Sequence, residues 1–141
     1  MEELHVGTCK TVVSMKIGEN TELQDFLKRM IKSNPKAMTS LQSAMVTICS
    51  EENYVNDRKF KSVSEPGIHE IKVPGIRLYC FQSRLADGQP RLIIATNGGT
   101  KNTDREQNRN IKRAAQIKDA FFAAKQADTV ILNYIPEDHE N

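Results

Sequence analysis

The spacing of apolar residues changes twice along the chain, and this change of period limits the folds that the sequence can adopt. Between about residues 20 and 50, apolar side chains recur every three or four positions, which predicts two amphipathic helices interrupted by Pro35. Between residues 68 and 97 they alternate with polar side chains or form short runs bounded by turn residues, which predicts three strands. Helical spacing returns after residue 103. The chain therefore combines a helical hairpin, a β-meander and a further helix.

Shorter β-rich segments flank this central pattern. Residues 9–18 and 129–135 each hold an apolar run that predicts one strand. The expected order is β-α-α-β-β-β-α-β, and helices segregated from consecutive hairpin-linked strands indicate an α+β fold with a mainly antiparallel sheet. The apolar run at 91–97 predicts a central, buried strand. A chain of 141 residues has room for one such domain, which we place at residues 1–135, with a loose acidic tail at 136–141.

Charge is distributed unevenly along the chain. The formal net charge is only +2, but residues 58–125 hold fourteen basic and six acidic side chains. A local excess of positive charge on this scale predicts a polyanionic partner such as nucleic acid. The alternative is a solvated charged surface with no partner. The sequence leaves both interpretations open.

The sequence argues against several other classes of protein. No apolar run approaches the roughly 20 residues that span a bilayer, and the acidic N-terminal segment does not read as a secretory signal, so we expect a cytoplasmic protein. Cys9, Cys49 and Cys80 are far apart, and the histidines are equally scattered. Since a zinc site or a disulfide framework needs clustered or paired residues, we expect no metal, no cofactor and no disulfide.

Several short motifs occur in a particular order in the second half of the chain. They are HEIK at 69–72 with the turn VPG, the strand IRLYCF at 76–81, the apolar strand LIIA at 92–95, and the loop GGTK at 98–101 followed by NIKRA at 110–114. Together with the preceding helical hairpin, this arrangement resembles the RelE/ParE toxin superfamily. The resemblance is more specific to its HigB-like, phage-derived branch. The resemblance covers about residues 20–127.

The resemblance implies a toxin of a type II toxin–antitoxin system. Proteins of this branch cleave mRNA without a metal, usually on the ribosome, and a cognate antitoxin neutralises them. We expect that antitoxin to be a helix-turn-helix protein, and we expect no membrane partner. Two alternatives stay open: a ParE-like inhibitor of DNA gyrase, and a non-catalytic nucleic-acid-binding module on the same fold.

Three basic residues are the candidates for catalysis. Metal-free RNA cleavage needs a group that deprotonates the 2′-hydroxyl, cations that stabilise the charge developing at the phosphate, and a proton for the leaving oxygen. Arg77 stands in an otherwise apolar strand, so it should face solvent, a partner such as Glu70, or a ligand. Lys101 in the glycine-rich loop and Arg105 near the next helix start are candidates for contact with the same phosphate; the alternative is a solvated loop.

Other residues are candidates for binding RNA. By alternation, Tyr79 shares a strand face with Arg77, where it either stacks on a base or packs in the core. His69 is a candidate acid or base, since histidine titrates near neutral pH, but it shares a face with Ile71 and Val73, which favours a packed structural role. The candidates for contact with the RNA backbone are Lys59, Lys61, Lys72, Arg109, Lys112 and Arg113.

The segment 100–118 departs from the pattern of the resembled family. Many ribonuclease members carry a tyrosine or histidine in this C-terminal loop and helix, where it serves acid–base chemistry or base stacking. This chain has neither residue there. Proton transfer would therefore fall to Lys101, His69 or another group.

Overall fold

The computed structural model describes residues 2–7, 9–14, 22–51, 59–84, 91–100 and 103–126. These ranges contain three helices and six strands. The helices are α1 (Glu22–Ser33), α2 (Pro35–Cys49) and α3 (Asp104–Gln126). The strands are β1 (Glu2–Val6), β2 (Lys10–Ser14), β3 (Phe60–Ser62), β4 (His69–Val73), β5 (Ile76–Ser83) and β6 (Arg91–Gly99).

The six described strands form one sheet in the order β1-β2-β6-β5-β4-β3. β2 and β6 are parallel, with Lys10 opposite Arg91 and Ser14 opposite Ala95. The other neighbouring strands pair antiparallel. The predicted α+β fold with a mainly antiparallel sheet is confirmed, and β6 lies in the interior of the sheet, as its apolar run predicts.

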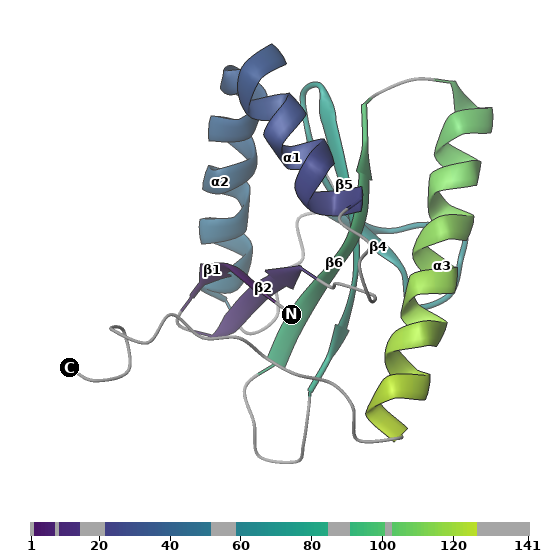
Figure 1. Cartoon of the computed structure of the whole chain (residues 1–141). Coiled ribbons are helices and arrows are strands. Elements are labelled where there is room, and N and C mark those ends of the chain that lie inside the picture. Colours follow the sequence, from purple (N-terminus) through teal and green to yellow (C-terminus); the bar gives the residue numbers. More distant parts are fainter. Residues whose placement is uncertain are drawn as a thin grey trace.

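The sheet separates two layers of helix. Figure 1 shows α1 and α2 covering one face, while α3 covers the other. The core on the α1–α2 face includes Val12, Leu23, Phe26, Leu41, Ile71, Leu78 and Ile93. The core on the α3 face includes Val13, Tyr79, Phe81, Ile94, Ala114 and Phe121. Because each fully buried large apolar side chain contributes roughly 1.5–3 kcal/mol, both layers are needed to stabilise the sheet.

Local signals in the sequence account for two helix starts. The Asn34 side chain accepts a hydrogen bond from the Ala37 N–H at 3.2 Å, and Pro35 follows at the first position of α2, where a missing N–H is tolerated. At α3, where Thr103 and Asp104 are both possible caps from the sequence, Thr103 Oγ1 accepts a hydrogen bond from the Glu106 N–H at 3.2 Å. Each cap of this kind contributes about 1 kcal/mol.

The two edge strands are not signalled by the sequence. β1 precedes the first predicted strand, and β3 lies in a polar segment that predicts a connection. Both strands are short, and each pairs with a single neighbouring strand: β1 with β2, and β3 with β4. Tertiary context therefore decides their conformation. The strand predicted at 129–135 and the acidic tail at 136–141 lie outside the described residues.

Gly98 in β6 faces the ring of Phe26 in α1, and a Cβ atom at this position would come within 2.3 Å of a ring carbon. We expect Gly98→Ala to lower the free energy of unfolding by about 1–3 kcal/mol, the range for overpacking a filled core. The cost should be clearly smaller in a Phe26→Leu background, which removes the ring. Urea unfolding of all four proteins measures this difference. Equal costs in both backgrounds would contradict the contact.

Candidate nucleic-acid interface

Two rows of mainly polar side chains cross the α3-side face of the sheet toward its β3 edge. Strand alternation places Glu70 and Lys72 on this face, because Ile71 between them packs in the α1–α2 core. The first row consists of Lys61, Glu70, Tyr79 and Asn97 on four successive strands. The second row consists of Lys59, Lys72, Arg77 and Gly99. The register of the sheet thus brings five candidates onto one face: Lys59, Lys61, Lys72, Arg77 and Tyr79.

The cations of these rows become more exposed toward the β3 edge. Lys59 and Lys61 are exposed, and Lys72 is half-buried. Lys61 Nζ lies 3.8 Å from Glu70 Oε1, and the Lys61 side chain keeps 44% of its surface exposed whereas Glu70 is buried. A nearby cation compensates part of the cost of burying a carboxylate. The rows therefore present lysines at the surface beside one buried carboxylate.

Arg77 is buried rather than exposed to solvent. Its side chain is 4% exposed, and its Nη1 donates hydrogen bonds to the Val73 carbonyl at 2.9 Å and the Ile76 carbonyl at 3.1 Å. These carbonyls flank the β4–β5 turn, where Gly75 adopts φ +87°, a conformation that glycine tolerates. The tight turn brings both acceptors to the guanidinium. Arg77 therefore stabilises this hairpin, while Glu70, its expected partner, pairs with Lys61.

Tyr79 lies in the core on the α3 face rather than at the surface. It is 1% exposed and packs in the cluster that includes Phe81 and Phe121. Burial and then the charge of Glu70 raise the pKa of Tyr79 to about 12, against the opposing charge of Arg77. The ring is not placed to stack on a base, and the hydroxyl keeps its proton at neutral pH. Of the two roles open from the sequence, the structure favours the core role.

A β-bulge in β6 decides which side chains this strand presents to α3. Tyr79 pairs with Asn97 while Cys80 pairs with Ala95, so Thr96 is the extra residue. The Thr96 hydroxyl lies 3.1 Å from the Tyr79 carbonyl oxygen and 2.7 Å from Asn97 Oδ1. Without the extra residue, Asn97 would share the α1–α2 face with Ala95. With it, Asn97 turns toward α3.

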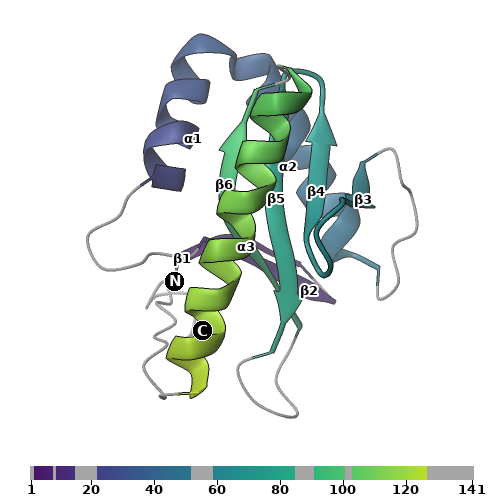
Figure 2. The same cartoon turned by 90° about the vertical axis from the view of Figure 1, so that its right-hand side faces the viewer.

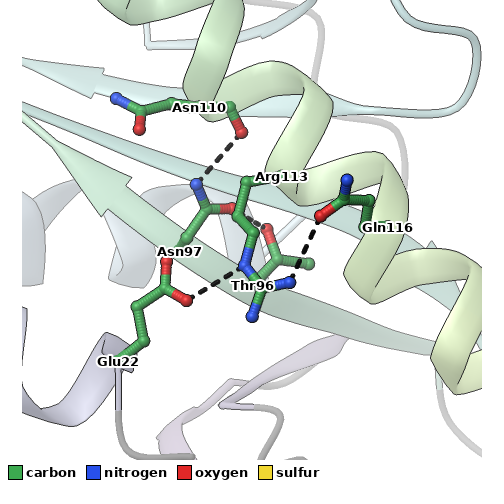
Figure 3. Close-up of polar contacts among 6 residues, drawn as sticks. All are labelled: Glu22, Thr96, Asn97, Asn110, Arg113 and Gln116. Atoms are coloured by element: carbon green, nitrogen blue, oxygen red, sulfur yellow. Dashed lines mark hydrogen bonds and ion pairs between the residues drawn. The ribbon is translucent and has the colours of Figure 1, made fainter.

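Asn97 and Arg113 connect the elements around this bulge (Figure 3). Asn97 Nδ2 donates to the Asn110 carbonyl at 3.0 Å, which joins β6 to α3. Arg113 Nε donates to Glu22 Oε1 at 3.0 Å, and its Nη1 donates to Gln116 Oε1 at 3.4 Å. Arg113, a candidate RNA contact, is therefore engaged in an ion pair between α3 and α1. Such a surface pair contributes about 0.2–1 kcal/mol.

Three exposed cations follow the outer side of α3. Arg105, Arg109 and Lys112 are spaced i, i+4 and i+7, so they share one side of the helix. Ala114 and Phe121 project from the opposite side into the core against the sheet. The three cations thus point away from the sheet, although α3 itself lies over the face that carries Tyr79, as the position of α3 in front of the strands shows (Figure 2). The structure brings the two sets to one side of the molecule without joining them in one cluster.

His69 lies on the other face of the sheet. Its ring stacks on Phe60 with centroids 4.9 Å apart, and its Nε2 is 3.2 Å from Ser62 Oγ. Burial is the main cause that lowers the pKa of His69; the charge of Lys10 adds to this shift, and the Gly67 backbone opposes it. His69 is therefore a packed, neutral side chain, as alternation favours. Its position across the sheet from Glu70 does not suit proton transfer at the rows.

Lys101 lies outside the described residues, so its place near the rows stays a prediction. The sequence pattern does not mark Asn97 or Asn110 as site residues, and it suggests Glu70 only as a partner for Arg77. A signal for Asn97 exists in retrospect, since it is a polar residue that ends the buried run of β6. The face toward which it points depends on the bulge, which the sequence does not reveal.

Comparison with protein-family models and with curated proteins found no match to this chain. Within the described ranges, no group of three His, Cys, Asp or Glu side chains is arranged to hold a metal ion. No helix in the same ranges combines the length and apolar character needed to cross a bilayer.

The stability of the protein should depend on the protonation of His69. Since folding lowers this pKa, the unfolded chain binds the proton more readily, and the free energy of unfolding should fall as the pH drops through about 6.5. We expect urea unfolding at about pH 7.5 and 5.5 to show this loss in the wild type and in His5→Gln. The loss should be smaller in His69→Gln. Equal losses in all three proteins would show that His69 is not the group responsible.

Proposed function

We propose that this chain binds the phosphate backbone of RNA on the α3 side of its sheet and cleaves it, as the toxin of a type II toxin–antitoxin pair. The observation that carries the proposal is that α3 lies over the face of the sheet that bears the two rows (Figure 2), and that both α3 and the rows carry cations that are exposed or half-buried. They are Lys59, Lys61 and Lys72 on the sheet, and Arg105, Arg109 and Lys112 on α3. The order of motifs that resembles the HigB-like branch supports the same function. The expected substrate is ribosome-bound mRNA in the cytoplasm, and the expected partner is a helix-turn-helix antitoxin.

The chemistry of these side chains suits a phosphate backbone. A lysine or arginine that neutralises a phosphate releases condensed counterions, which favours binding at low salt. The guanidinium groups of Arg105 and Arg109 can each donate two parallel hydrogen bonds to one phosphate, while the lysines act as point charges. Of these six cations, Lys61 is the one that forms an ion pair within the described residues, and its partner is Glu70. The others are therefore available to a polyanion, and Lys61, whose side chain is exposed, becomes available when it leaves Glu70.

The two rows also supply groups for metal-free cleavage. On this proposal, Lys61 moves from Glu70 to the phosphate as the RNA binds and so uncovers the buried Glu70 carboxylate. Glu70 then removes the proton from the ribose 2′-hydroxyl as that oxygen attacks the neighbouring phosphorus. Lys61 and Lys72 stabilise the charge that develops on the phosphate oxygens. The bond to the 5′-oxygen then breaks, and Lys101 is the candidate that protonates this leaving group. Arg77 and Tyr79 hold the hairpin and the core beside Glu70, without contacting the RNA.

Neutralising the sheet cations should weaken RNA binding in a salt-dependent way. For a single-stranded RNA, we expect the plot of log affinity against log salt concentration to become less steep by about 1.4 in Lys61→Gln/Lys72→Gln. This change corresponds to about 0.7 for each of the two phosphate contacts that are lost. Fluorescence anisotropy at several salt concentrations measures this slope. Arg84→Gln/Arg91→Gln is the matched control, because it removes two cations from the opposite end of β5 and β6. Equal slopes for the two variants would contradict the proposed surface.

Replacing Glu70 should strongly reduce cleavage while leaving binding intact. A general base contributes roughly 10²–10⁴-fold, so Glu70→Gln should reduce cleavage by about that factor. Induced expression of the wild type should arrest growth and create new mRNA 5′ ends, and both effects should be absent in Glu70→Gln. Glu65→Gln, in the exposed β3–β4 loop, is the matched control and should behave as the wild type.

The outcomes of this expression experiment separate the functions. Arrest with intact mRNA in the wild type would overturn the ribonuclease proposal in favour of a gyrase inhibitor. If the wild type causes no growth arrest and creates no new 5′ ends, the protein is not a toxin of this kind. New 5′ ends that persist in Glu70→Gln would uphold the toxin and remove Glu70 from the role of base.

A further inference from the structure

The junction of α1 and α2 carries a second cluster of positive charge. Lys28, Arg29, Lys32 and Lys36 are all exposed, and no acidic residue lies between positions 28 and 36. Within the described residues, the ion pairs are Lys61 with Glu70 and Arg113 with Glu22, so none of these four cations has a carboxylate partner. We call these four residues the helix-junction cluster.

Helix stability does not account for this cluster. Lys28 and Lys32 are spaced i and i+4 on α1, where like charges oppose helix formation. Lys36 lies in the first turn of α2, where the helix dipole disfavours a cation and no acidic residue compensates it. Only Lys32, in the last turn of α1, has a favourable position with respect to the dipole. Arg29 lies over the Phe26 ring, with its Cζ 6.0 Å from the ring centroid. Neither the dipole of α1 nor that of α2 accounts for Lys28 and Lys36, which suits a role in binding.

The cluster lies at the same end of the molecule as the rows on the sheet. The β4–β5 turn packs on the α1–α2 turn, since a Cβ atom on Gly75 would come within 2.7 Å of Asn34 Nδ2 and 3.7 Å of the Ala37 Cβ. Lys72 stands close to this same β4–β5 turn. Figures 1 and 2 both show the α1–α2 junction, the β4–β5 turn and the start of α3 at one end of the molecule.

We propose that the helix-junction cluster is a second binding surface for the phosphate backbone of the same RNA, which passes over the β4–β5 turn from one face of the sheet to the other. This inference rests on the proposed function. The RNA then contacts Lys72 and Lys61 on one side of the turn and Lys32 and Lys36 on the other.

An RNA backbone fits this cluster better than an acidic protein segment does. The four side chains belong to two helices and are all exposed, whereas the centre of a protein interface is formed by side chains that bury themselves in well-packed pockets. Long lysine side chains without carboxylate partners suit a repeating row of phosphates, because binding to phosphates depends more on charge than on shape complementarity. The proximity of Lys72 makes the two surfaces continuous for one polyanion.

The test compares Lys32→Gln/Lys36→Gln with the wild type for binding of a 24-nucleotide single-stranded RNA. The variant should fold as the wild type does, since both side chains are exposed, and its thermal unfolding midpoint verifies this. With two fewer phosphates neutralised, the salt slope should fall by about 1.4, which is about 25-fold in affinity at 0.1 M salt. Arg84→Gln/Arg91→Gln, which removes two cations from the far end of the sheet, should leave the slope unchanged.

Each outcome bears on the inference. A slope equal to that of the wild type would overturn the second surface, while the proposed function would stand if Lys61→Gln/Lys72→Gln still lowers the slope. No RNA binding by the wild type would contradict both proposals. If Lys32→Gln/Lys36→Gln keeps its RNA affinity but no longer binds poly-L-glutamate, the cluster serves an acidic protein and the inference is wrong.

Discussion

The parallel pairing of β2 with β6 is the constraint on which the rest of the structure depends. Parallel neighbours need a crossover connection, and here α1, α2 and the strands β3–β5 lie between them in the chain. This pairing leaves the helical hairpin on one face of the sheet. α3, which follows β6, packs on the other face (Figure 1). The division into two faces separates the rows that contain Glu70 from the face that contains His69.

The bulge at Thr96 then determines the composition of the candidate site. By shifting the register, it turns Asn97 toward α3, where the Asn97 amide binds the Asn110 carbonyl. The start of α3 is thereby held beside the sheet rows, and Arg113 joins the same helix to Glu22. The cations of α3 thus stand on a helix fixed at two points. A rigid scaffold of this kind presents charges in constant positions to a partner.

Periodicity in the sequence is sufficient to predict the helical hairpin, the β4–β5 hairpin and the interior position of β6. It fails where the outcome depends on contacts that are distant in sequence. Arg77 looks exposed in its strand, but the turn at Gly75 supplies two carbonyl acceptors that allow its burial. The edge strands and the bulge likewise depend on their neighbours, not on their own residues. The lysines of the rows are evident as charges in the sequence, yet only the register shows that they share a face.

The measurement that tests the central claim most directly is photocrosslinking of the wild-type protein to a short RNA that contains 4-thiouridine, with the crosslinked peptides identified by mass spectrometry. The account predicts crosslinks in β3 and β4 around Lys61 and Lys72 and in the first turns of α3. Crosslinks confined to the opposite end of the sheet, near Arg84 and Arg91, would contradict it. Failure of the protein to crosslink at low salt would contradict RNA binding altogether.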